Sequence, residues 1–294
     1  MNWRRFFLRD GKLHPGWRAF LFLPLYFLTT TIAGAIFGLA YYLITRKIFT
    51  ARPSFAIMTL IELVITGAVI MLVFIMRHFL DGKSFRSLGF EINGRLPLEI
   101  GFGLALGFLL MVLIFVLHVM SGWAVVEQFA FSVQGFQRLA FSFLFLLPAA
   151  LNEEVAFRGY FLQNLEEAFG TGWAVGISSL IFSLFHIFNP NFSYLAFINI
   201  ALAGVFFAFA YLLTRNLWLP TALHFSWNYF QGPVFGFPVS GINFPSFMVL
   251  ELGPSNHILS GGAFGPEGGL TGTIANLLGM AILWLWARKN AQKL

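Results

Sequence analysis

Three short motifs in the second half of the chain combine side chains that can activate water against a carbonyl group. They read Glu-Glu-x-x-x-Arg at 153–158, Phe-x-x-x-His at 182–186 and His-x-x-x-Asn at 224–228. Carboxylates, imidazoles and an amide are the groups that hydrolysis by an activated water requires. The chain has no cysteine, which excludes a thiolate nucleophile, and no Ser-His-Asp arrangement competes.

The two adjacent glutamates differ in what lies one helical turn further along the chain. Glu154 is followed four residues later by Arg158, so the two side chains share a helix face and can pair. Glu153 points about 100° away from Glu154, and its own i+4 neighbour is Phe157. We therefore predict that Arg158 neutralises Glu154 and that Glu153 is left free to take a proton from water. A charged helix end at the membrane surface is the alternative interpretation.

The imidazoles and the amide supply the remaining groups. The i, i+4 spacing aims His224 and Asn228 the same way, and Asn228 could donate to an oxyanion. Glu153, His186 and His224 together could hold Zn or another divalent metal, and a metal-free mechanism stays open. The plainer alternatives are a packed histidine bonded to a backbone carbonyl and hydrogen bonds between helices.

Two further polar residues, Glu62 and His118, stand inside apolar segments without a motif around them. A charged group at the centre of a membrane helix costs about 2.5–3.5 kcal/mol on insertion scales. Each residue therefore needs a hydrogen-bond partner, and we interpret both as structural.

The three motifs together resemble those of the CPBP intramembrane proteases. That family includes type II CAAX prenyl endopeptidases, Ras-converting enzymes, and bacteriocin-processing or immunity proteins. The stretch Glu-Glu-Val-Ala-Phe-Arg-Gly-Tyr-Phe-Leu-Gln at 153–163 is similar to the family as well, and the resemblance covers about 139–230. Three motifs in order are more specific than any one of them. The long stretch 231–269 is not expected from the family.

The resemblance implies a fold and a role for each motif residue. The fold is an all-α bundle of eight helices with an intramembrane polar cavity that opens toward the cytoplasm. Glu153 would activate the water, supported by the ion pair that begins one residue later. His186 and His224 would bind a metal or position the water, and Asn228 would stabilise the oxyanion.

The composition places this chemistry inside a membrane. Of the 294 residues, 58% are hydrophobic and only 10% are charged, whereas soluble chains average about 25% charge. These values exclude a soluble enzyme, a disordered tail and a disulfide scaffold. The net charge of +6 does not indicate nucleic acid, because Lys and Arg of membrane proteins collect on the cytoplasmic side. We expect a single membrane domain over 1–294 with its catalytic core at 139–230.

Eight apolar runs are candidates for spanning helices, each of which needs roughly 20 residues. They cover 19–44, 54–76, 97–119, 139–154, 173–188, 194–214, 219–230 and 270–286. With the N-terminus inside, the cytoplasmic connections, Arg158 among them, carry 14 Lys and Arg, and the outer loops carry 4. This asymmetry predicts a multi-pass protein of the cell membrane with both termini in the cytoplasm.

Two details of this topology concern the site. The stretch 231–269 contains no Lys or Arg, so it is expected to form an extended outer loop that closes the outer mouth of the bundle. His186 lies thirteen residues past Trp173, about 20 Å along the helix. That height is too great to meet Glu153 unless the helix is tilted or starts below the membrane.

The leading functional hypothesis is an intramembrane endopeptidase that hydrolyses a peptide bond of a membrane-associated or lipid-anchored peptide or protein. Its partners would be membrane lipid and that substrate, without nucleic acid, while substrate identity and oligomeric state stay open. A non-proteolytic immunity or resistance protein that binds a peptide in the same cavity is the second hypothesis. A proton-coupled transporter is the third, because intramembrane Glu and His can relay protons.

Overall fold

The chain folds into a helical bundle with two short β-ribbons. The computed structural model describes residues 6–46, 54–253 and 256–290 and is 75% helical, which confirms the predicted all-α fold. The long helices are α2 (Pro15–Thr45), α3 (Phe55–Met76), α4 (Leu96–Met120), α5 (Val133–Glu154), α8 (Tyr194–Thr214) and α11 (Leu270–Lys289). The shorter ones are α6 (Leu162–Phe169), α7 (Thr171–Leu184), α9 (Trp218–Tyr229) and α10 (His257–Ser260).

The structure also contains tighter and wider helical turns and four strands. The π-helical segments are η1 (Arg77–Asp81), η3 (Val155–Phe161) and η4 (Phe230–Val234). The 3-10 segments are η2 (Phe85–Leu88), η5 (Gly262–Phe264) and η6 (Pro266–Gly268). The strands are β1 (Leu8–Arg9), β2 (Lys12–Leu13), β3 (Ala124–Phe129) and β4 (Met248–Leu252).

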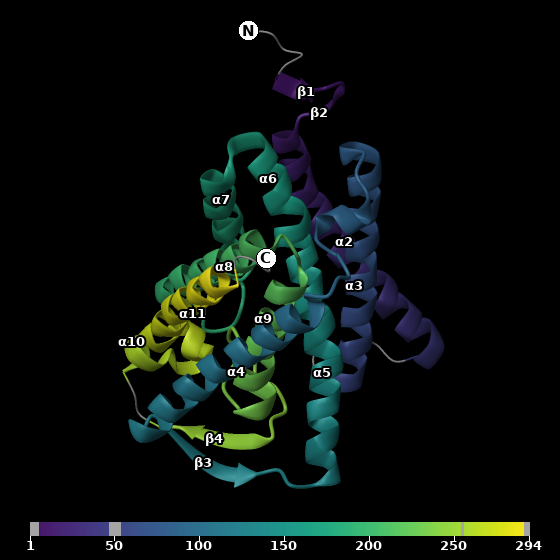
Figure 1. The fold of residues 1–294 in the computed structure, drawn as a ribbon. Coiled ribbons are helices and arrows are strands. Elements are labelled where there is room, and N and C mark those ends of the chain that lie inside the picture. The colour runs from purple at the N-terminus through teal and green to yellow at the C-terminus, as the bar shows by residue number, and fades with distance from the viewer. Residues whose placement is uncertain (1–5, 47–53, 254–255, 291–294) are drawn as a thin grey trace.

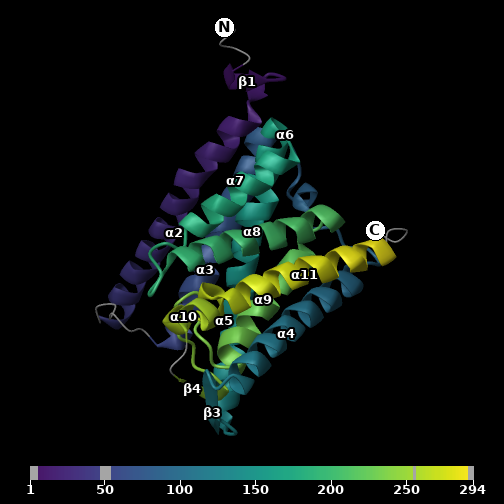
Figure 2. The same cartoon turned by 90° about the vertical axis from the view of Figure 1, so that its left-hand side faces the viewer.

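Six helical segments of the described chain are long and apolar enough to cross a membrane. They are Pro15–Thr45, Phe55–Asp81, Leu96–Met120, Val133–Phe169, Tyr194–Thr214 and Leu270–Lys289. The fifth and seventh predicted spans correspond to α7, with 14 residues, and α9, with 12, and both are shorter than a bilayer requires. The protein is therefore a polytopic membrane protein in which two of the eight expected spans are shorter helices. Figures 1 and 2 show α9 inside the bundle, beside α4 and α5.

The predicted end of the fourth span is wrong. Helices α5, η3 and α6 form one helical run from Val133 to Phe169, so Arg158 lies within a helix and not in a loop, while the side of the membrane that it faces stays a prediction. The physical reason is that Arg158 pairs with Glu154 inside the bundle, where it is only 2% exposed. The wider π-helical turn η3 follows the glutamates directly, and such turns are frequent at functional sites.

A hairpin of helices brings His186 back toward the level of the glutamates. The helical run continues 15 residues past Glu154 to Phe169. Gly170 then turns the chain with a positive φ of 83°, and the return from Thr171 to His186 is again 15 residues. At 1.5 Å per residue, each arm is about 22 Å long. The expected mismatch in height disappears because α7 starts well beyond the glutamates.

Two glycines on α4 let α9 approach closely. A Cβ added at Gly103 would lie 2.8 Å from the carbonyl oxygen of Leu219, and one at Gly107 would lie 2.7 Å from the Cβ of Ser226. A Gly-x-x-x-Gly spacing brings helix backbones together in membranes for this reason. Ser226 also donates to the carbonyl oxygen of Leu104 at 2.7 Å. These contacts fix the position of α9, which carries the third motif.

The segment 231–269 is folded against the bundle. It contains η4, β4, α10, η5 and η6. Strand β4 pairs antiparallel with β3, with Val126 opposite Leu250 and a bulge before Gln128. Figure 1 shows this ribbon at the end of the molecule opposite the N-terminus. The segment covers that end of the bundle, and the side of the membrane that it faces stays a prediction.

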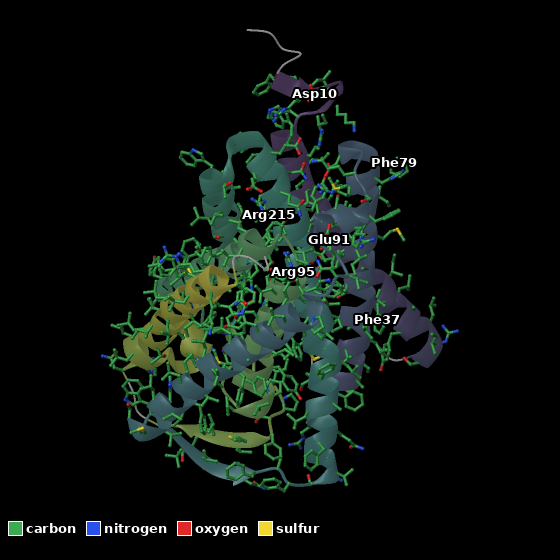
Figure 3. All side chains as sticks on the ribbon, viewed as in Figure 1. Asp10, Phe37, Phe79, Glu91, Arg95 and Arg215 are labelled. Atoms are coloured by element: carbon green, nitrogen blue, oxygen red, sulfur yellow. The ribbon has the colours of Figure 1, made fainter. Side chains whose placement is uncertain are left out.

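A buried charge cluster lies toward the N-terminal end of the bundle. The label of Asp10 marks this end in Figure 3. Asp81 accepts a hydrogen bond from Arg77 at 2.9 Å and lies 3.5 Å from Arg18. The hydroxyl of Tyr160 donates to Asp81 at 3.2 Å. Because Tyr160 belongs to η3, the cluster anchors the π-helical turn that follows the glutamates.

Candidate active site

One cavity of about 310 Å³ is lined by residues of α2, α3, α5, α7, α8, α9 and α11. Its wall includes Glu153, His186, His224 and Asn228. The structure therefore brings together the four side chains that the motifs predicted to converge. Most of the remaining wall is aromatic or aliphatic, so these polar groups face a space that an apolar chain can also occupy.

Glu154 joins the first and third motifs through a buried hydrogen-bond network. Its Oε1 accepts one hydrogen bond from Arg158 Nη1 and one from His224 Nδ1, both at 2.8 Å. The predicted Glu154–Arg158 pair is confirmed, while the direct bond to His224 was not foreseen. A carboxylate at this distance accepts the Nδ1 proton, which leaves Nε2 of His224 as a free acceptor.

Aromatic rings enclose Arg158, which explains the phenylalanine of the second motif. The guanidinium carbon lies 4.4 Å from the ring centre of Phe182 and 5.2 Å from that of Phe207, within cation–π range. Arg158 also donates to the carbonyl oxygen of Gly204 at 3.3 Å. Phe207 stacks on His224 with ring centres 4.5 Å apart. The buried charge is thus both paired and hydrogen-bonded, as burial requires.

Glu153 is the glutamate of the pair that forms no salt bridge with a Lys or Arg of the described residues. Its Oε2 lies 3.8 Å from His224 Nε2, too far for a direct hydrogen bond. That buried oxygen has no hydrogen-bond partner among the described residues. Both atoms are acceptors, and one water molecule can reach each of them at about 2.8 Å. The pair is therefore arranged to hold a water next to a carboxylate that can remove its proton.

His186 lies in the turn that follows α7, outside the regular helix. Its Nδ1 lies 2.8 Å from the carbonyl oxygen of Phe182, so Nδ1 donates and Nε2 is again the free acceptor. The hydrogen bond to a backbone carbonyl that a packed histidine was expected to make is therefore present. The imidazole of His186 nevertheless lines the cavity. Asn228 lies one helical turn past His224 and adds an amide donor to the same wall.

The three residues predicted to bind a metal share the cavity without forming a metal site. Within the described ranges, no group of three or more His, Cys, Asp or Glu side chains is placed to hold a metal ion. Both His186 and His224 do bind a fixed acceptor through Nδ1, as metal-binding histidines do. The donor chemistry of the two imidazoles thus suits a metal, although the described residues gather no third ligand beside them. The need for a metal stays a prediction, and no step below depends on one.

Polar residues outside the motifs also line the cavity, among them Glu62 on α3, Glu267 in the segment 231–269 and Asn276 on α11. Glu62 accepts a hydrogen bond from Thr66 at 3.0 Å, as a structural role requires. Because Glu62 also lines the cavity, a structural role alone does not describe it. The spacing Glu-x-x-x-Thr within one span was the signal available for Glu62. Glu267 and Asn276 carried no comparable signal in the sequence.

His118 lies outside the site and fits its structural interpretation. Its two ring nitrogens lie 2.8 Å from the carbonyl oxygen of Ile114 and 3.2 Å from that of Ser260. The imidazole is 1% exposed. It joins α4 to the segment 231–269 and does not line the large cavity.

These features define the class of the molecule as a polytopic all-α membrane protein with carboxylate and imidazole groups gathered in a cavity inside the bundle. Residues 135–230 match the family model described as type II CAAX prenyl endopeptidase Rce1-like. The matched range contains all three motifs and confirms the resemblance to the CPBP family. The helices before α5 and everything after residue 230 lie outside it. Searches of curated proteins and of solved structures gave no match.

Proposed function

We propose that this protein is an intramembrane endopeptidase that hydrolyses a peptide bond of a membrane-associated or lipid-anchored substrate. The observation that carries the proposal is the pair of facing acceptors, Glu153 Oε2 and His224 Nε2. The match to an endopeptidase family supports the reaction class. The apolar wall of the cavity suits a substrate that arrives from the membrane.

In the proposed reaction, a water molecule donates its two O–H groups to Glu153 and His224. Glu153 removes one proton as the water oxygen attacks the carbonyl carbon of the substrate, and a tetrahedral oxyanion forms. The amide of Asn228 donates to that oxyanion. Protonated Glu153 then returns the proton to the leaving nitrogen, the C–N bond breaks, and an amine and a carboxylic acid are released.

The other motif residues position these groups. Glu154, charged and paired with Arg158, keeps the imidazole of His224 oriented with Nε2 toward the cavity. His186 offers a second free Nε2 and positions the water or the N–H of the scissile peptide. Neither role requires Glu154 or His186 to exchange a proton with the substrate.

We further propose that the substrate reaches the cavity laterally, between α3 and the turn after α7. Glu62 on α3 and His186 in that turn both line the cavity, while α3 and α7 pack little against each other. Exposed aromatic side chains flank the turn, with Phe188 at 91% and Tyr194 at 94%, as expected for a lipid-facing surface. The cytoplasmic location of both termini rests on the Lys and Arg asymmetry of the sequence.

The test is cleavage by the purified full chain in lipid nanodiscs. A library of membrane-anchored peptides is incubated with the wild type and with Glu153→Gln, and the products are identified by mass spectrometry. Wild type is expected to cleave and Glu153→Gln to be inactive with an unchanged unfolding temperature. Glu127→Gln, which changes an exposed carboxylate on β3, is the matched control and should retain activity.

The same preparation separates the competing classes. Peptide binding without any Glu153-dependent product would favour the non-proteolytic immunity or resistance protein. Proton-coupled flux across sealed vesicles, again without cleavage, would favour the transporter. Either result would overturn the endopeptidase assignment.

A further inference from the structure

The cavity wall carries three carboxylates and, among the described residues, no lysine or arginine. The carboxylates are Glu62, Glu153 and Glu267. None of the three forms an ion pair with a Lys or Arg of the described chain. Glu154, beside the cavity, is by contrast compensated by Arg158. Glu267 is therefore a cavity carboxylate that the proposed hydrolysis does not use and that forms no ion pair with a Lys or Arg of the described chain.

Glu267 is held in place by donors that carry no charge. Its Oε2 accepts hydrogen bonds from the backbone N–H and the hydroxyl of Ser240, at 2.6 and 2.8 Å, and its Oε1 accepts one from the indole N–H of Trp227 at 3.1 Å. A carboxylate has about four acceptor positions, so one position on Oε1 stays open. The neutral donors fix the geometry of Glu267 and leave its charge without a counter-ion.

Asn276 adds an acceptor that has no partner. Its Nδ2 donates to the carbonyl oxygen of Gly272 at 3.0 Å, which identifies Oδ1 as the free end of the amide. Oδ1 is buried without a hydrogen bond among the described residues, and the whole residue is 2% exposed. An unpaired buried acceptor is unfavourable, and a ligand that donates a hydrogen bond removes that penalty.

These two residues belong to one part of the cavity wall. Helix α11, which carries Asn276, packs against η6, which carries Glu267. Asn199 on α8 binds the same turn, because its amide donates to the carbonyl oxygen of Glu267 at 2.9 Å. The two acceptors thus have a rigid support built from α8, α11 and η6, and they face a space shared with the reacting groups.

We infer that Glu267 and Asn276 form a substrate subsite for a positively charged, hydrogen-bond-donating group, namely a Lys or Arg side chain of the peptide. The inference rests on the proposed endopeptidase function and names the substrate class of the same cavity. A side chain of this kind supplies both the counter-charge that Glu267 lacks and the donor that Asn276 Oδ1 lacks. Charge complementarity of this type determines specificity.

The position of the subsite limits where the basic residue stands. Trp227, whose indole N–H donates to Glu267, follows His224 by three residues on α9, and Trp227, His224 and Glu267 line the same cavity. An extended peptide advances about 3.3 Å per residue, so the basic residue lies within about three residues of the scissile bond.

Cleavage kinetics of matched peptides test the subsite. Membrane-anchored peptides carry Lys, Gln or Glu at each of the three positions on either side of the scissile bond, and kcat/KM is measured for the full chain in nanodiscs. Lys is expected to exceed Gln by about tenfold at one position, with Glu lowest. Glu267→Gln should bring Lys and Gln within about twofold. Glu251→Gln, an exposed acid on β4 in the same segment, should keep the preference.

Because Glu267 also accepts hydrogen bonds from Ser240, Glu267→Gln could misfold. A second variant and a binding measurement therefore test the subsite independently. Asn276→Asp adds a carboxylate of equal size and should increase the preference for Lys. The unfolding temperature is also measured with acetyl-Leu-Lys-Leu-amide and acetyl-Leu-Glu-Leu-amide, because a ligand of the native state raises it. Only the Lys peptide should raise it, and Glu153→Gln should leave that increase unchanged.

The outcomes separate the subsite from the reaction. Equal binding of the two peptides, or a preference for Glu, would overturn the subsite even if cleavage depends on Glu153. A Lys-specific increase in unfolding temperature without any cleavage would support the subsite and defeat the proposed endopeptidase.

Discussion

Glu154 Oε1 accepts hydrogen bonds from His224 and Arg158 at the same distance, 2.8 Å. The hydrogen bond between Glu154 and His224 joins residues that are 70 positions apart in the chain and connects α5 to α9. The same hydrogen bond gives the two adjacent glutamates different roles. Glu154 is a buried positioning residue with its charge compensated, and Glu153 is the uncompensated group in the cavity.

The two glutamates should therefore respond differently to loss of charge. Glu154→Gln leaves Arg158 buried without a counter-charge, so we expect the free energy of unfolding to fall by about 3–5 kcal/mol. Glu153→Gln should leave stability nearly unchanged, because its side chain is 29% exposed and forms no ion pair with a Lys or Arg of the described residues. Unfolding in detergent micelles measures both variants. The double variant Glu154→Gln/Arg158→Met is the control, and it should recover stability without cleavage. Equal stability of the two single variants would contradict this division.

Asn228 should act on the chemical step more than on binding. We expect Asn228→Ala to lower kcat by about 10²–10³ because the oxyanion loses its donor, while KM changes by less than about threefold. Steady-state kinetics of a cleaved peptide measure both constants. Asn93→Ala removes an exposed amide outside the cavity and should behave as wild type. A rise in KM with an unchanged kcat would assign Asn228 to substrate binding instead.

The close contact between α4 and α9 should be sensitive to a single methyl group. Gly107→Ala places a Cβ 2.7 Å from the Cβ of Ser226, and overpacking of this kind costs about 1–3 kcal/mol. Because α9 carries His224, we expect both stability and kcat to fall. Gly101→Ala is the matched control on the same helix, since its Cβ would meet nothing within 4 Å. Loss of stability in both variants to the same extent would mean that helix flexibility, and not the contact, is responsible.

Metal removal separates the two mechanisms that the sequence left open. Glu153 and His224 can hold the water without a further group, so we expect cleavage to continue after exhaustive chelation. Elemental analysis of the purified protein accompanies the activity measurement. Inactivation by the chelator with recovery on adding Zn²⁺, lost in His186→Ala, would instead restore Glu153, His186 and His224 as a ligand set.

The sequence by itself determined the membrane class, the all-α fold and the residues of the three motifs. These inferences follow from composition and local spacing, which need no knowledge of distant contacts. The i, i+4 relation of Glu154 and Arg158 is a property of one helix, so their pairing could be predicted. The resemblance of the motifs named a family that the match over 135–230 then confirmed.

Tertiary structure decided how the motifs meet and what else faces them. The burial of Arg158 within a continuous helix could not be predicted, because the aromatic rings that enclose its charge come from α7 and α8, which are distant in the sequence. The bond from Glu154 to His224, and the places of Glu267 and Asn276, arise from segments far apart in sequence. Local periodicity contains no information about such contacts, since they depend on packing between helices and on which buried polar groups must find partners.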